Sequence, residues 1–279
     1  ECALNPIIHH LDENSYYSEP HPKDAIFLHH TEGYYRPDWV ISSWDRNKTN
    51  STNKIRTAAC LVIGGKDPKE LDNSYDGVVM QAFPPNAWAH NLSIKSKNNT
   101  FLNQKSISIE LCNFGQLIES LDGGFYTKTH VRIPEDQICE LTHPFRGYTY
   151  FHLYSDKQLE SLRKMLLDLS EKFEIDLSRG IKKEILKSES PLPEGISGLK
   201  LQKWLNKNGF TDAWGMKIHE TGEMDQKTRE ALESVGKNPF SLNPIALNGG
   251  PGLWSHSNVR MDLLDATPQP KLIELIKSL

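Results

Sequence analysis

NQKSISIEL, residues 103–111, decides the fold more than any other stretch of this chain. From Ser106 to Leu111 polar and apolar residues alternate, which is the period of a β-strand that buries one face. In such a strand Glu110 points to the face opposite Leu111. Three short apolar runs of strand length lie earlier in the chain, at residues 25–28, 58–63 and 77–83. Together these stretches predict a β-sheet.

A long amphipathic helix follows the predicted strands. Ser155 opens it and Gln158 stands three residues later, so the pair predicts a capping box. Strands followed by such a helix predict an α/β domain in which helices pack on a sheet. The residues that form its apolar stripe recur at helical spacing: Leu159, Leu162, Leu166, Leu169 and Phe173.

The chain changes character after residue 180. Residues 183–198 are charged and contain two prolines and two glycines, which is typical of a linker. A compact helical pattern continues to about residue 237, in which Gly209 is suited to end one helix and Asp225 to cap the next. Residues 238–252 are loop-like. These features predict a small all-helical insertion in the α/β domain.

The composition excludes some classes of protein. The 279 residues are 37% hydrophobic and 24% charged, with a formal net charge of −4. This is ordinary for a globular protein and lacks the basic excess of nucleic-acid-binding proteins. No apolar run approaches the ~20 residues that span a bilayer. The chain begins at Glu1 with a polar segment, so no signal peptide is visible in it.

Four cysteines are present, and none forms a CxxC pair, so a cysteine-based zinc cluster is not expected. Cys60 and Cys112 sit inside apolar runs and are expected to be buried free thiols. A disulfide between two of the four, which include Cys2 and Cys139, is left open, and so is the redox compartment.

The residue types of a catalytic zinc site are present but scattered along the chain. Such a site takes three protein ligands, His and Asp among them, and leaves a fourth position open. His29 ends a predicted buried strand, and His256 lies far away in sequence, followed by Asp262 and Asp265 in one loop. Each residue alone is weak support, because a chain with 11 histidines offers many accidental pairings.

Four motifs, taken in order, resemble those of one family. DAIFLHHTEG at 24–33 and TAACLVIGG at 57–65 resemble its first two strands. NQKSISIEL matches the motif N-x-x-S-I-G-I-E-L, with Ser108 in place of the glycine, and WSHSNVRMDLLDATPQP at 254–270 resembles the closing motif. The family is the type 2 N-acetylmuramoyl-L-alanine amidases, which include peptidoglycan recognition proteins and phage amidases. The resemblance covers roughly residues 24–180 and 240–279.

This resemblance implies a fold and a reaction. The fold is an α/β domain with a central mixed β-sheet flanked by helices. The reaction is zinc-dependent hydrolysis of the amide between N-acetylmuramic acid and the L-alanine of the peptidoglycan stem peptide. Two alternatives stay open: a non-catalytic protein that binds peptidoglycan, and a zinc peptidase that acts within the stem peptide.

The implied partner is bacterial peptidoglycan or its muropeptides, and neither nucleic acid nor a membrane span is expected. The implied location faces the cell envelope, whether the protein is periplasmic, secreted, a phage lysin or a toxin effector.

Carried over position by position, the resemblance also implies site residues. His29 and His256 match the first and second Zn²⁺ ligands, and Glu110 matches the catalytic acid. Asp265 is preferred to Asp262 as the third ligand, because the proline and the helix that follow it then fall in register.

Two further site residues follow less directly. The family places a basic residue two positions before the last ligand, where this chain has Leu263, so Arg260 is the expected catalytic substitute. His90, in WAHNLS at 88–93, is expected to contact substrate. His30 is expected to face away from the metal, because adjacent strand residues point to opposite faces.

The insertion carries a resemblance of its own. LKLQKWLNKNGF at 199–210 and ETGEMDQKTREALES at 220–234 resemble the repeat of small helical peptidoglycan-binding modules. A structural helical hairpin is the alternative. We therefore predict a discontinuous zinc amidase domain at residues 1–185 and 238–279, interrupted by a helical peptidoglycan-binding-like module at residues 186–237.

Overall fold

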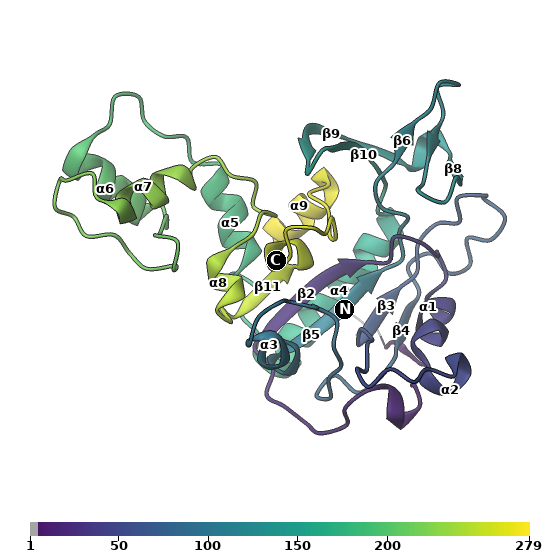
Figure 1. Cartoon of the computed structure of the whole chain (residues 1–279). Coiled ribbons are helices and arrows are strands. Elements are labelled where there is room, and N and C mark those ends of the chain that lie inside the picture. Colours follow the sequence, from purple (N-terminus) through teal and green to yellow (C-terminus); the bar gives the residue numbers. More distant parts are fainter. Residues whose placement is uncertain (1–4) are drawn as a thin grey trace.

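The computed structural model describes residues 5–279, and a six-stranded mixed sheet lies at its centre (Figure 1). The strand order is β1-β4-β3-β5-β2-β11. All neighbouring pairs are parallel except β3 and β4. The predicted central mixed sheet is confirmed. Its strands are β1 (Ile7–Ile8), β2 (Ala25–His30), β3 (Leu61–Ile63), β4 (Val79–Gln81), β5 (Ser106–Leu111) and β11 (Gly252–Ser255).

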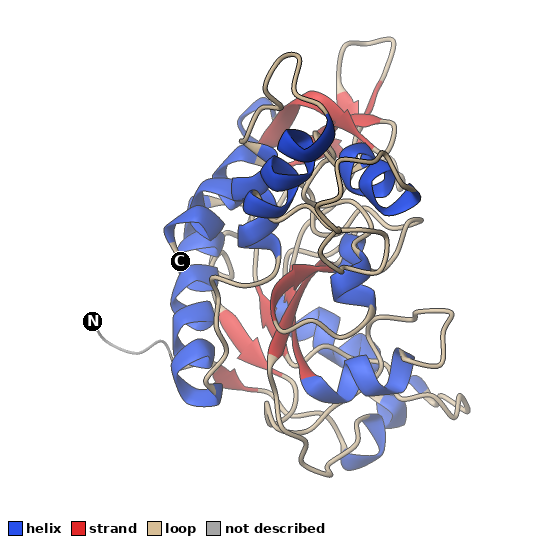
Figure 2. Ribbon diagram, turned by 90° about the vertical axis from the view of Figure 1, so that its left-hand side faces the viewer, coloured by secondary structure: helices blue, strands red, loops and turns tan. Residues whose placement is uncertain are grey.

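Helices cover both faces of this sheet, as Figure 2 shows. The long helix α4 and the short helix α1 both contact β3, while α5 contacts β11. The arrangement agrees with the predicted α/β class. The helices are α1 (Pro37–Trp44), α2 (Arg46–Thr49), α3 (Asn99–Lys105), α4 (Asp156–Phe173), α5 (Ile181–Ser188), α6 (Gly198–Lys207), α7 (Gln226–Glu233), α8 (Pro244–Leu247) and α9 (Pro270–Ser278).

The strand predicted at residues 58–63 is longer than the observed strand β3, which includes only the second half of that stretch. Only Leu61–Ile63 pairs with β5. The backbone N–H of Ala58 donates to the His90 carbonyl, and that of Cys60 donates to the Ser108 hydroxyl at 3.0 Å. The first half of the apolar run therefore pairs with the segment around His90, and Ser108, which replaces the family's glycine, supplies an acceptor that a glycine lacks.

The predicted capping box at α4 is half right. The Ser155 hydroxyl accepts from the Gln158 N–H at 3.0 Å. The Gln158 side chain, however, donates to the carbonyls of Ile63 and Cys112 at 3.0 and 2.9 Å and does not return to Ser155. Ile63 is the last residue of β3 and Cys112 directly follows β5, and both residues are buried. The Gln158 amide therefore joins the carboxyl ends of the two strands.

Two smaller sheets between β5 and α4 were not predicted. Strands β6, β7 and β8 have two residues each, which is too short to show alternation. Strand β9 has eight residues, but its alternation stops at three successive exposed residues. The turn between β9 and β10 carries Arg146, whose guanidinium donates to the carbonyls of Ser257, Arg260 and Leu263. The hairpin of β9 and β10 therefore holds residues 257–263 in place. The strands are β6 (Ile118–Glu119), β7 (Phe125–Tyr126), β8 (Arg132–Ile133), β9 (Ile138–Phe145) and β10 (Tyr148–His152).

The inserted segment has a small apolar core separate from the main one. Trp204 stacks on Phe210 with ring centroids 5.4 Å apart, and Asp225 caps α7 by accepting from Thr228 N–H at 2.8 Å. Helix α5 belongs to the main core, through residues such as Ile181. The cluster lies within residues 186–237, whose identity as a separate module stays a prediction. Its buried members are Leu201, Leu205, Phe210, Ile218 and Ala231.

The cysteines that the structure describes are Cys60, Cys112 and Cys139, and all three are free and buried. Cys2 lies outside the described residues. Within residues 5–279, no helix combines the length and apolar character that crossing a bilayer requires.

Candidate metal centre

His29, His256 and Asp265 meet at the carboxyl-terminal edge of the sheet. His29 is the second-last residue of β2. His256 directly follows β11, which is the parallel neighbour of β2. The two Nδ1 atoms are 3.0 Å apart, and Asp265 Oδ2 lies 2.9 Å from His256 Nδ1 and 3.4 Å from His29 Nδ1. All three residues are buried. Three potential ligand atoms therefore converge on one point from distant parts of the chain.

This donor set fits a zinc ion. Zinc bonds to His nitrogen and carboxylate oxygen are about 2.0–2.2 Å long, so neighbouring ligand atoms of a tetrahedral site lie on the order of 3.3–3.6 Å apart. The observed triangle is close to one face of such a tetrahedron. The other ring nitrogen of His256, Nε2, donates to the Leu92 carbonyl at 2.9 Å, so Nδ1 is the atom that a metal can take once it has displaced the Nδ1 proton.

The electrostatics of the three residues favour an ionised carboxylate. Burial alone raises the pKa of Asp265, but the charge of His256 and hydrogen bonds from both histidines hold that pKa well below its ordinary value. Burial and, after it, the charge of His256 lower the pKa of His29 to about 4, although the neighbouring Asp265 acts in the opposite direction. His29 is therefore a neutral imidazole at neutral pH, which is the form that binds metals.

The segment that carries Asp265 is fixed by hydrogen bonds on both sides. The Asp265 carbonyl accepts from Ser257 N–H at 2.8 Å, and the Tyr154 hydroxyl accepts from Thr267 N–H at 3.0 Å. The same hydroxyl is hydrogen-bonded to His30 Nδ1 at 2.8 Å. His30 thus turns away from the His29–His256–Asp265 cluster, on the opposite face of β2.

Asp262 and Arg260 pair with each other outside this cluster. Two nitrogens of the Arg260 guanidinium donate to the Asp262 carboxylate at 2.7 and 2.6 Å, and a third donates to the Ser93 carbonyl at 2.7 Å. Of the two aspartates that follow His256, the structure brings Asp265 to the histidines and leaves Asp262 exposed. Three of the five N–H groups of the Arg260 guanidinium are engaged by Asp262 and Ser93.

Glu110 stands next to the cluster on the neighbouring strand. It is the register partner of His29 in the β2–β5 pair. Burial raises the pKa of its carboxyl well above 4.5, and the charge of Asp265 adds to this effect. Glu110 lines a cleft of about 180 Å³ together with Thr31, Tyr34 and Asn91. A carboxyl with a raised pKa at the edge of a cleft can both take and return a proton.

His90 is not among the residues that line this cleft. Its ring packs against Trp88 and Tyr17, and its Nδ1 is 3.4 Å from the Asn99 amide nitrogen. The next residue, Asn91, lines the cleft and interacts with His29. Sequence reasoning missed Asn91, because the family pattern drew attention to the histidine in WAHNLS.

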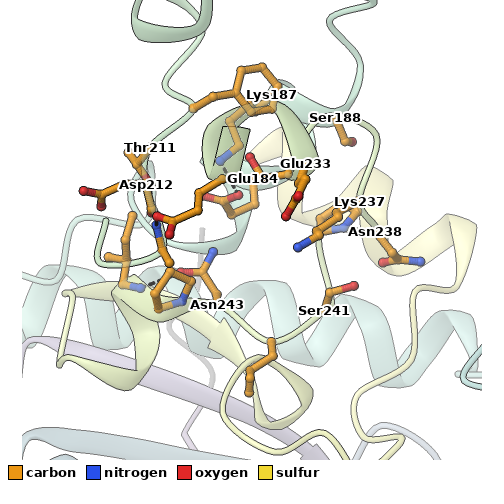
Figure 3. Close-up of a pocket in the computed structure, with 18 of the residues that line it drawn as sticks. Glu184, Lys187, Ser188, Thr211, Asp212, Glu233, Lys237, Asn238, Ser241 and Asn243 are labelled. Atoms are coloured by element: carbon orange, nitrogen blue, oxygen red, sulfur yellow. Dashed lines mark hydrogen bonds and ion pairs between the residues drawn. The ribbon is translucent and has the colours of Figure 1, made fainter. Parts of the chain in front are cut away.

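A cavity of about 320 Å³ lies elsewhere, where the insertion meets α5 and residues 238–247 (Figure 3). Two of its charged side chains pair with each other: Lys187 is 2.7 Å from Glu184 and lies over the Phe210 ring. It contains none of the predicted site residues. We therefore place the candidate active site at the Glu110 cleft.

Comparisons with known proteins found similar solved structures only. No family model matches the chain, and no curated protein matches it. The structure of PlyL has a TM-score of 0.37 at 12% identity, covering 63% of this chain and 78% of that one. The N-acetylmuramyl-L-alanine amidase AmiD from E. coli has a TM-score of 0.36 at 13% identity, covering 93% and 89%. AmpDh3 from Pseudomonas aeruginosa has a TM-score of 0.32 at 14% identity, covering 81% and 96%.

Proposed function

We propose that this protein is a zinc-dependent peptidoglycan amidase that cleaves the amide between N-acetylmuramic acid and the L-alanine of the stem peptide. One observation carries the proposal: His29, His256 and Asp265 converge within 3.4 Å of one another, with Glu110 in register beside them. The motif resemblance assigns the ligand and acid roles to these same residues. The choice of bond and of substrate rests on that resemblance.

In this proposal His29, His256 and Asp265 hold the zinc ion. When bound, zinc supplies a Lewis acid that polarises a carbonyl and lowers the pKa of water. Glu110 takes a proton from the attacking water at a carboxylate oxygen. It then gives that proton to the amide nitrogen as the C–N bond breaks, so the stem peptide leaves with a neutral amine. The raised pKa of Glu110 suits the second step.

Arg260 is proposed as a catalytic residue and His90 as a substrate-binding residue, both outside the three metal ligands. Arg260 would stabilise negative charge on the carbonyl oxygen, but its guanidinium first has to part from Asp262. His90 would contact substrate beyond Asn91. The motif resemblance supports peptidoglycan binding by residues 186–237, and the separate apolar core supports a distinct module there.

Digestion of purified peptidoglycan, with mass spectrometry of the released fragments, tests the proposal. An amidase releases stem peptides with a free L-alanine amine and leaves intact lactyl groups on the glycan. A peptidase would instead release fragments of the stem peptide, and a binding protein would release nothing. Zinc content, measured on the same preparation, tests the metal separately.

A further inference from the structure

We propose that Asn91 is a positioning residue of the metal centre: its side-chain oxygen accepts a hydrogen bond from His29 Nε2–H when zinc is bound at His29 Nδ1. This inference rests on the proposed function, because it concerns the same site. Asn91 is half-buried and lines the Glu110 cleft. Its neighbours on both sides of the side chain point to the role.

Two buried polar atoms at the cluster have no hydrogen-bond partner among residues 5–279: His29 Nε2 and Asn91 Oδ1. His29 Nδ1 lies 3.0 Å from His256 Nδ1 and 3.4 Å from Asp265 Oδ2, so Nε2 is the ring nitrogen that remains for Asn91. A buried N–H and a buried carbonyl oxygen are both unfavourable without a partner. Each of these two atoms is the kind of partner that the other lacks.

The Asn91 side chain is close enough to His29 to act on it. It works to raise the pKa of the imidazole, opposite to the effect of burial, and a hydrogen-bond acceptor has this effect. Asn91 Nδ2 donates to the Ala89 carbonyl at 3.1 Å, so Oδ1 is the atom of the amide that is left to face the ring. The contact is not a regular hydrogen bond in this structure, and we expect it to become one when zinc fixes the ring.

The next residue along the chain serves the other histidine in the same way. The Leu92 carbonyl accepts from His256 Nε2 at 2.9 Å. The backbone N–H groups of Asn91 and Leu92 both donate to the side-chain oxygen of the buried Asn103, at 2.9 and 3.2 Å. One short segment, held by Asn103, therefore presents an acceptor to the Nε2 atom of each histidine.

An acceptor at Nε2 matters for a histidine that binds metal through Nδ1. It keeps the proton on Nε2 and fixes the orientation of the ring, and loss of such a partner typically costs 10- to 100-fold in metal affinity. Because the described residues give His29 Nε2 no other partner, Asn91 should set how tightly His29 holds the metal.

Zinc affinity, measured by competition with a chelator, tests the inference. Asn91→Ala should bind zinc about 10- to 100-fold more weakly than the wild type, and Asn91→Asp, which keeps an acceptor oxygen, should retain most of the affinity. Asn206→Ala is the matched control, because Asn206 is also half-buried and its amide donates to the Ile218 carbonyl at 2.9 Å within the insertion. Nitrogen-15 NMR of the zinc-loaded proteins gives a second measurement. Asn91→Ala should lose one of the imidazole N–H signals that are protected from exchange in the wild type, and Asn91→Asp should keep it.

Equal zinc affinity in the wild type and Asn91→Ala overturns the inference, and so does an unchanged set of protected imidazole signals in that variant. Chemical denaturation with and without zinc separates positioning from support of the fold. Asn91→Ala should lower the stability of the zinc-loaded protein and leave that of the metal-free protein near the wild-type value. An equal loss in both states would show that Asn91 only supports the fold. Zinc binding by the wild type that does not depend on Asn91 refutes the positioning role alone, whereas a wild type that binds no zinc refutes the proposed metal centre as well.

Discussion

His29 and Glu110 are paired positions of the parallel strands β2 and β5. Side chains at paired positions of neighbouring strands lie on the same face of a sheet. The imidazole proposed to hold zinc and the carboxyl proposed to move protons are therefore placed side by side by one stretch of backbone pairing. Because the two strands pair through backbone groups, a substitution of either side chain leaves the hydrogen bonds between the strands in place. The two roles can thus be tested separately.

Replacing His256 by Ala should abolish zinc binding. The change removes one of three converging ligand atoms and leaves Asp265 without its 2.9 Å partner. Zinc content, measured by atomic emission on purified protein, should fall from about one per chain to near zero, with loss of hydrolysis. His143→Ala, at an exposed position on β9, should keep its zinc. Full zinc content in His256→Ala would remove His256 from the ligand set.

Replacing Glu110 by Gln should preserve zinc binding and reduce turnover. The amide is nearly isosteric with the carboxyl, but it cannot accept and return a proton. General acid–base groups contribute about 10²–10⁴-fold, so kcat should fall within that range on a soluble muropeptide. Near-normal kcat would exclude Glu110 from proton transfer. Loss of zinc in this variant would instead make Glu110 a ligand.

The activity should also fall on acidification through the raised pKa of Glu110. Burial, and then the charge of Asp265, raise this pKa well above 4.5. Glu110 has to be ionised to take a proton from water, so kcat/KM should rise with pH through a step that lies above 4.5. The residual activity of Glu110→Gln should lack that step. Zinc content measured at each pH separates this step from metal release, and an acidic step that persists in Glu110→Gln would contradict the assignment.

The sequence predicted what depends on local pattern. The strand at 106–111 was predicted correctly, but its alternation does not reflect burial of one face, because Ser106 and Ser108 are buried and hydrogen-bonded. The helix at 156–173 is visible because its apolar stripe is buried. Strands β6 to β8 escaped prediction because two residues carry no periodicity, and β9 escaped it because its alternation stops at the exposed residues 142–144. The missing half of the capping box has another cause. The Gln158 amide serves two strand carbonyls that are distant in sequence.

Site residues at the ends of strands could be predicted from the sequence. Site residues whose position depends on the path of a loop could not. His29 and Glu110 could be placed by counting along strands. The choice between Asp262 and Asp265 depended on the path of the closing loop, which Arg146 holds through three carbonyls. The pairing of Arg260 with Asp262 was not predicted, because the resemblance relates both residues only to the metal site.

Replacing Tyr154 by Phe should destabilise the fold and weaken zinc binding. The hydroxyl accepts from the buried Thr267 N–H at 3.0 Å, two residues from Asp265. Removing it leaves that N–H without an acceptor, which costs about 1–3 kcal/mol. Chemical denaturation of the metal-free protein should show the loss. Tyr126→Phe, which removes a hydroxyl bonded to the exposed Asp122, is the matched control. Equal stability of both variants would show that the Tyr154 hydroxyl is dispensable.

The last prediction concerns the insertion. Residues 186–237 include the end of α5, whose Ile181 and Ile185 pack in the main core and whose following residue Glu189 pairs with Lys277 at 2.8 Å. A deletion should therefore keep Glu189 and remove residues 191–236, rejoined by a flexible Gly-Ser linker. The apolar cluster of the insertion is removed whole, so the remaining core keeps its contacts. The shortened protein should fold, bind zinc and cleave a soluble muropeptide, because the proposed ligands and Glu110 lie outside the deletion.

Binding to intact cell walls decides what the insertion does. Two linked sites on one polymer raise the effective concentration of each, so losing one weakens binding by about 10²-fold or more without touching the other. A sedimentation assay with purified walls, using Glu110→Gln in full-length and shortened forms to prevent digestion, measures this loss. Unchanged sedimentation by a folded deletion variant would make the insertion a structural hairpin. Failure of the deletion variant to fold, seen as loss of cooperative unfolding, would place residues 191–236 within the folding unit of the sheet and overturn the domain assignment.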